Sequence, residues 1–170
     1  MIEFVIWRLP YYKDICKDVR TEPELLPVGN VQIDSSNIAE KARLDVSAIG
    51  LWSPMERTFQ DVRVVHPNAA SYRDKTIEKI YEIHEKEKKR SYNQRVMQVE
   101  RATFTPLVFS TTGGMAPECA KFHKRVAELI SNKTHEDYSK VMNHIRTRVR
   151  FTLLKSTLIP IRGERGKQKK

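Results

Sequence analysis

The chain has 170 residues, of which 39% are hydrophobic and 31% charged, with a formal net charge of +10 at pH 7. This length and composition predict one folded domain with a hydrophobic core. No apolar run reaches the roughly 18 residues that a membrane-spanning helix needs, and the short apolar start lacks the pattern of a signal peptide, so we expect no membrane association. Cys16 and Cys119 stand alone in dissimilar settings, and we expect both to be reduced and buried rather than bridged or metal-bound.

The first quarter of the chain predicts a helix, a short strand and a loop. Apolar residues fall near helical spacing over residues 2–17, although Pro10 would kink a helix there. Residues 18–26 predict a short strand that Pro23 confines to a sheet edge or ends early. Turn-forming residues then predict a loop over residues 28–41.

A β-hairpin and a long helix are expected next. Residues 42–48 and 58–65 predict two strands, and residues 53–56 between them predict the turn. The longest helix is expected over residues 74–100, with Asp74 as its N-cap. The hairpin and this helix therefore form the centre of the predicted domain.

The last part of the chain predicts a buried strand followed by helices. The strand is expected at the apolar run 107–109, and the two helices over residues 115–132 and 135–159. We predict that residues 1–160 form a single domain. The final ten residues, 161–170, are expected to be a disordered basic tail.

Two carboxylates and one cation are expected to converge on the hairpin. Asp61 and Arg63 project to the same side of a strand, and a hairpin centred near residue 54 brings Asp45 opposite Arg63, within one or two positions. Two close carboxylates repel each other unless a cation lies between them, and Mg²⁺ is the usual one. This pattern is typical of metal-assisted phosphodiester cleavage. The alternative is an ordinary surface ion pair, in which Arg63 simply pairs with Asp45.

Positive charge increases toward the end of the chain, where residues 143–170 hold nine Lys or Arg and a single acidic residue, Glu164. A basic end of this kind favours a polyanionic partner, most often nucleic acid. The alternatives are a solubilising tail and a nuclear-import signal. The residues predicted to contact nucleic acid are Arg146, Arg148, Arg150, Arg162, Arg165 and Lys167. The separate basic run at residues 88–90 is interpreted as a solvated helix face.

The order helix, three strands, helix, strand, with acids on the second and third strands, resembles the PD-(D/E)xK superfamily. The resemblance implies an α/β protein with a restriction-endonuclease-like core and extra C-terminal helices. It also implies that Asp45 and Asp61 bind Mg²⁺ or Mn²⁺, joined by the backbone carbonyl of Val62. Arg63 takes the position of the superfamily's lysine, which is a departure because arginine cannot serve as a general base. Glu3 falls where the superfamily places a helper acid.

Several blocks of sequence resemble one family from invertebrate genomes, the C-terminal part of retroelement open reading frames that encode a reverse transcriptase. These blocks include Cys16-Lys17-Asp18-Val19, Ala42-Arg43-Leu44-Asp45, Phe59-Gln60-Asp61-Val62-Arg63-Val64 and Phe104-Thr105-Pro106-Leu107-Val108-Phe109-Ser110. The resemblance implies a retroelement-derived endonuclease domain, active or degenerate, that works on DNA, with RNA as the other possible partner, in an intracellular, nuclear setting. The alternative is a non-catalytic nucleic-acid-binding module that uses the basic C-terminal helix and tail. The sequence leaves the oligomeric state open.

Overall fold

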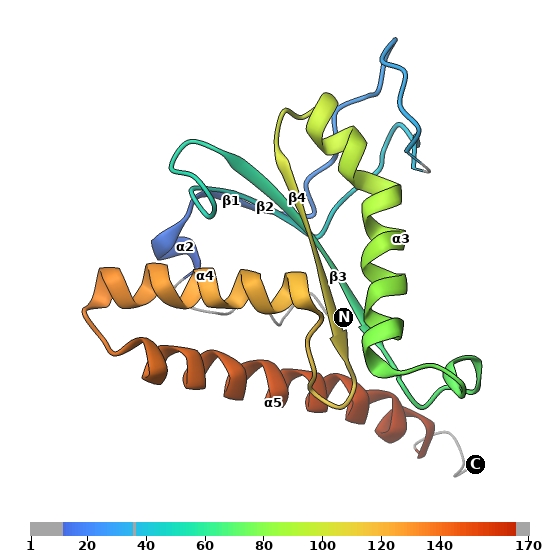
Figure 1. The fold of residues 1–170 in the computed structure, drawn as a ribbon, viewed down its shortest axis with the longest axis vertical. Coiled ribbons are helices and arrows are strands. Elements are labelled where there is room, and N and C mark those ends of the chain that lie inside the picture. The colour runs from blue at the N-terminus through green and yellow to red at the C-terminus, as the bar shows by residue number, and fades with distance from the viewer. Residues whose placement is uncertain (1–11, 36, 166–170) are drawn as a thin grey trace.

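A four-stranded mixed β-sheet forms the centre of the protein in the computed structural model, which describes residues 12–35 and 37–165 (Figure 1). The strands are β1 (Lys17–Thr21), β2 (Val46–Ile49), β3 (Arg57–Val65) and β4 (Thr103–Ser110), and they lie in that order across the sheet. β1, β2 and β3 pair antiparallel, whereas β3 and β4 pair parallel. The prediction of an α/β protein is therefore confirmed.

Helices cover both faces of the sheet. They are α2 (Tyr12–Ile15), the short 3₁₀ helix η1 (Ala70–Tyr72), α3 (Ile77–Gln98), α4 (Pro117–Thr134) and α5 (Tyr138–Arg165). α3 connects the parallel strands β3 and β4 and lies on one face, while α2 and α4 lie on the other and α5 packs along α4 (Figure 1). None of the helices in the described ranges is long and apolar enough to cross a membrane.

The alternation of side chains along β3 explains how one strand serves both layers. Phe59 and Val65 belong to buried clusters that include residues of α3. Val62 and Val64 pack against the larger core cluster, which α4 and α5 complete from the opposite side. Asp61 lies between Phe59 and Val65 in the same alternating set, so its side chain points toward α3.

The long loop before β2 is fixed to α3 by Arg95, whose side chain is fully buried. Its guanidinium donates hydrogen bonds to the backbone carbonyls of Leu26 (2.9 Å), Asn37 (3.2 Å) and Ala39 (2.8 Å). Hydrogen bonds satisfy buried polar groups that would otherwise cost free energy. Arg95 therefore anchors the loop that leads into β2, at whose start Asp45 lies.

The early elements differ from prediction in their bounds. The predicted helix over residues 2–17 is described only as α2, because residues 1–11 lie outside the described part of the chain. The predicted strand over residues 18–26 is instead β1, followed by an isolated bridge between Glu24 and Arg43. The proline at position 23 lies just after β1, where a ladder hydrogen bond is no longer needed.

The ends of α3 and α5 also differ from prediction. The N-cap of α3 is Thr76, whose hydroxyl accepts a hydrogen bond from the Lys79 amide, so the prediction of Asp74 as the cap is wrong. α5 continues through Arg165, which places the first five residues of the predicted tail within the helix. Residues 166–170 lie outside the described ranges.

Candidate active site

Strand pairing brings Asp45 and Asp61 to the same place on the sheet. Val46 of β2 pairs with Gln60 of β3, and continuing that antiparallel register by one residue sets Asp45 opposite Asp61. Directly opposed residues of an antiparallel pair project from the same face. The predicted partner of Asp45 was Arg63, two residues further along β3, within the range given. The two carboxylates therefore occupy the α3 side of the sheet where β2 begins.

The carboxylate of Asp45 binds the backbone of β3. Its Oδ2 accepts a hydrogen bond from the backbone amide of Val62 at 2.6 Å. This contact lies just beyond the last β2–β3 pair, so the side chain takes the place of a strand carbonyl as acceptor. It holds the Asp45 carboxylate beside the residue that follows Asp61.

Asp61 is buried, with 7% of its surface exposed, and it forms an ion pair with Lys88 of α3. Only 17% of the Lys88 side chain is exposed. Burial raises the pKa of Asp61 above its ordinary value, the Lys88 ammonium opposes this effect, and the neighbouring Asp45 carboxylate adds to it. The site therefore contains two carboxylates close enough to repel each other and one enclosed ammonium.

Arg63 points toward α3 but belongs to a second polar group. Its guanidinium donates to Glu87 Oε2 at 2.6 Å and lies 3.1 Å from His84 Nδ1. The other ring nitrogen of His84 is 2.7 Å from the hydroxyl of Tyr72. Burial, together with the Arg63 charge, lowers the pKa of His84, which favours a neutral ring that accepts from Arg63 at Nδ1 and donates to Tyr72 from Nε2. The alternative interpretation, in which Arg63 pairs with Asp45, is wrong.

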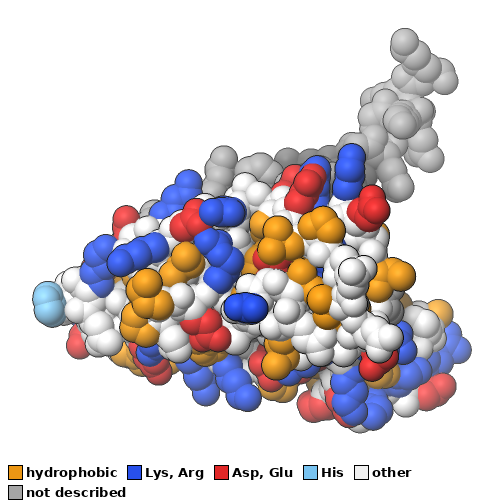
Figure 2. Space-filling model, turned by 90° about the horizontal axis from the view of Figure 1, so that it is seen from above, with side chains coloured by type: hydrophobic (Ala, Val, Ile, Leu, Met, Phe, Trp, Pro, Cys, Tyr) orange, Lys and Arg blue, Asp and Glu red, His pale blue; other side chains and the backbone are white. Residues whose placement is uncertain are grey.

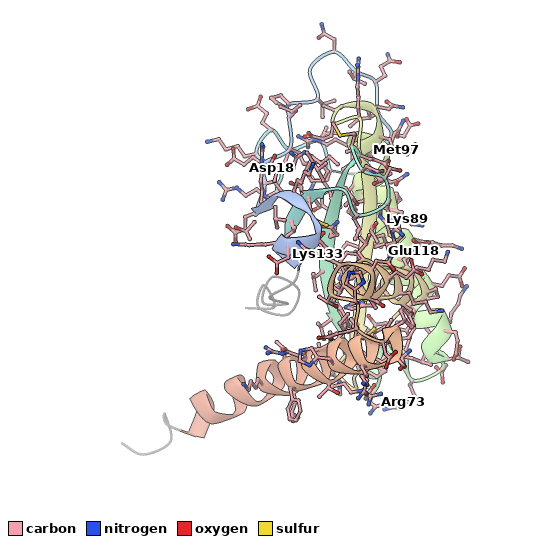
Figure 3. The ribbon with its side chains drawn as sticks, turned by 90° about the vertical axis from the view of Figure 1, so that its left-hand side faces the viewer. Asp18, Arg73, Lys89, Met97, Glu118 and Lys133 are labelled. Atoms are coloured by element: carbon pink, nitrogen blue, oxygen red, sulfur yellow. The ribbon has the colours of Figure 1, made fainter. Side chains whose placement is uncertain are left out.

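The basic run on α3 is not a uniformly solvated face, and that interpretation must be corrected. Lys88 is enclosed against Asp61, whereas Lys89 forms an ion pair with Glu118 of α4 at 3.1 Å, where α3 approaches the start of α4 (Figure 3). Arg90 alone of the three is exposed. Consecutive helix residues are rotated by about 100° from one another, so one charged run contributes to several faces. Lys88 is thus the residue of this site that sequence reasoning missed.

The donor set is suited to a hard cation with few protein ligands. Asp45 and Asp61 each keep an oxygen, Oδ1, that accepts no hydrogen bond from the described residues. Among those residues there is no group of three or more His, Cys, Asp or Glu side chains that could hold a metal ion. Mg²⁺ commonly binds to one or two carboxylates and completes its octahedron with water and substrate oxygens. The predicted helper acid, Glu3, lies outside the described residues.

Three of the residues predicted to contact nucleic acid lie on a different helix from Lys88. Arg146, Arg148 and Arg150 are exposed on α5, which packs along α4, whereas Lys88 belongs to α3 on the other face of the sheet (Figure 1). Arg162 and Arg165 lie within the last part of α5, where the structure describes the backbone alone, and Lys167 lies beyond the described range. Among the described residues, the predicted arginines and the two carboxylates therefore belong to different elements of the fold.

Comparisons with known proteins do not assign a family to this chain. No family model, no curated protein and no solved structure matches it. The functional conclusion therefore depends on the side chains that the fold brings together.

Proposed function

We propose that this protein is a metal-dependent DNA endonuclease domain of the PD-(D/E)xK type, derived from a retroelement. The observation that carries the proposal is the convergence of Asp45 and Asp61 where β2 begins, with the ammonium of Lys88 placed on Asp61. The order of elements, with three antiparallel strands followed by a helix and a parallel strand, supports the same proposal. A buried Asp–Lys pair on its own can serve a purely structural role. The proposal therefore depends on the second carboxylate, that of Asp45.

The residues that would hold the metal are Asp45 and Asp61, with the backbone carbonyl of Val62 as a further oxygen ligand. The free Oδ1 atoms of the two carboxylates fit Mg²⁺ or Mn²⁺, both of which prefer oxygen ligands. A bound ion of this kind would supply Lewis-acid chemistry, polarising a phosphate and lowering the pKa of bound water. The hydrogen bond from the Val62 amide fixes the Asp45 carboxylate and leaves its other oxygen for this purpose.

Lys88 is the residue that we assign to the role of the superfamily's lysine. Its ammonium lies on the same carboxylate that would bind the metal, and it offers compact positive charge and hydrogen-bond donors to a phosphate. Arg63 is held by Glu87 and His84 instead. The lysine position on β3 is therefore replaced by a helix residue that reaches the site from α3.

Nicking of supercoiled plasmid tests the proposal. We expect the parent protein to nick DNA with Mg²⁺ or Mn²⁺ and not with a chelator. Asp61→Asn, which preserves the shape of the side chain, should abolish nicking, and Lys88→Met should lower its rate by about 10²–10³-fold, the usual effect of losing one charged donor. Lys86→Met is the matched control, because Lys86 is an exposed lysine of the same helix and its loss should leave nicking unchanged.

Two further results distinguish this assignment from its competitors. Arg63→Lys should not raise the nicking rate, because the residue at this position contacts Glu87 and His84. Binding of Mn²⁺, followed by electron paramagnetic resonance, should weaken in Asp45→Asn and in Asp61→Asn. If Asp61→Asn nicks DNA as fast as the parent, the carboxylates are not the site, and the non-catalytic nucleic-acid-binding module becomes the better proposal.

A further inference from the structure

The side of α5 that faces away from α4 combines exposed apolar residues with exposed cations. Val141, Ile145 and Val149 point into the core, which fixes the rotation of the helix. On the side away from these residues, Phe151 is 61% exposed and Leu154 is 52% exposed. Phe151 and Leu154 are three residues apart, so they are neighbours on the helix surface and form one exposed apolar patch, a feature that can mark an interaction site.

Two cations lie beside this ring. At about 100° of rotation per residue, Arg148 and Lys155 fall within about 60° of Phe151 around the helix, whereas Arg150 and Arg146 fall about 100° and about 140° away, toward α4 and the loop before it. All four are exposed, and residues 138–155 contain no Asp or Glu. Acidic, basic and hydrophobic side chains are interspersed on the face shown in Figure 2, so a helix side with one sign of charge is distinctive. We call this surface the α5 ridge.

We propose that the α5 ridge binds an unpaired nucleic-acid strand, with a base stacked on Phe151 and phosphates on the flanking cations. Aromatic stacking combined with a positively charged track is the usual way in which proteins hold single strands without reading their sequence. Bases in a duplex are stacked on one another, so a duplex would contact the cations but would offer no free base to stack on Phe151. The inference concerns a surface away from Asp45 and Asp61 and does not rest on the proposed nuclease.

Charge and area argue against the other occupants of this surface. Two copies of the ridge would bring cations against cations, which opposes self-association through this surface. Helices that lie in a membrane surface bury a broad apolar face, whereas the described outer side of α5 offers two large apolar residues, Phe151 and Leu154. A polyanion with exposed aromatic bases satisfies both the ring and the cations.

Fluorescence anisotropy with a labelled oligothymidylate tests the proposal, with a hairpin duplex as the second probe and the full chain carrying Asp61→Asn to prevent cleavage. Phe151→Leu keeps an apolar side chain but removes the ring. It should weaken binding of the single strand by about 5- to 150-fold, the range for losing one stacked base, and leave its salt dependence and duplex binding unchanged. Phe151→Trp should restore affinity. Arg148→Ala should instead reduce the salt slope by about 0.7 for the single strand.

Several outcomes would overturn the proposal. If Phe151→Leu binds oligothymidylate as tightly as its parent, or loses affinity equally for both probes, the ring does not stack on a base. If Phe151→Leu sediments differently from its parent, the ridge binds a second copy of the chain. If the protein binds anionic vesicles and this binding depends on Phe151, the ridge binds a lipid surface. A protein that binds as predicted but fails to nick DNA leaves this inference intact and removes only the proposed nuclease.

Discussion

Replacement of the buried His123 should flatten the dependence of stability on pH. The ring lies in α4 against Phe109 and Phe122, with ring centroids 5.8 and 5.2 Å away, and its Nδ1 donates to the Cys119 carbonyl at 2.8 Å. Nε2 has no hydrogen-bond partner among the described residues. Burial lowers the pKa of His123 to about 4, with the charge of Arg146 acting in the same direction and the Cys119 carbonyl against it.

The sign of the effect follows from which state binds the proton. As pH falls, the unfolded chain protonates this histidine near its ordinary pKa of 6.5, whereas the folded protein keeps it neutral until about pH 4. Stability is therefore fully present above about pH 6.5, declines by about 1.4 kcal/mol per pH unit below it, and has lost about 3 kcal/mol by about pH 4.

Urea denaturation followed by circular dichroism measures this directly. Between about pH 7 and about pH 5, the free energy of unfolding of the parent should fall by about 2 kcal/mol more than that of His123→Leu. This variant replaces the ring with an apolar side chain of similar size that cannot be protonated. The substitution His144→Gln, at an exposed position of α5, controls for the loss of a histidine in general. Equal losses in the parent and His123→Leu would refute the reasoning, because they would show that the ring can be protonated in the folded protein.

Three other contacts give predictions of their own. Arg95→Leu removes the donor of three backbone carbonyls, so it should lower the free energy of unfolding by about 3 kcal/mol or more and open residues 26–41 to limited proteolysis, with exposed Arg90→Leu as the control. Glu85 Oε1 accepts from the Glu118 amide at 2.9 Å and caps α4, whose own N-cap, Ala116, offers no side-chain acceptor. Glu85→Ala should therefore cost about 1 kcal/mol in chemical denaturation, and the exposed neighbour Lys86→Ala much less. Lys88→Met should raise the pKa of Asp61 further in a carboxyl NMR titration, since it removes the charge that opposes burial; an unchanged titration would show that the ammonium does not lie on Asp61.

The hairpin was predictable because its evidence is local. Alternating side chains mark both strands, and the turn at Ser53 is closed as expected by a hydrogen bond from the Glu56 amide to the Ser53 carbonyl at 3.2 Å. The exact register was not predictable to one residue. Pairing of Val46 with Gln60 centres the hairpin at residue 53 instead of 54, and such a change moves the partner of Asp45 by two positions, from Arg63 to Asp61.

The role of Lys88 could not be predicted, because it depends on how α3 is rotated against the sheet. Residues 85–90 are charged at every position, so no apolar periodicity shows which of them faces inward. The rotation is set by distant apolar packing, in one cluster that contains Ile80 and Val65 and a second that contains Val96 and Phe59. Once those contacts are fixed, position 88 faces Asp61, 27 residues earlier in the chain.

In the proposed nuclease, the charge balance of the site favours a lysine from α3 over the arginine of β3. Arg63 and Glu87 neutralise each other, so this pair contributes little net charge to its surroundings. Asp45, Asp61 and Lys88 together carry one net negative charge when both carboxylates are ionised. A divalent cation would turn that into one net positive charge, which matches the single negative charge of a phosphodiester. Were Arg63 to join this group without Glu87, the group would be neutral before any metal bound, and the electrostatic demand for a divalent cation would be lost.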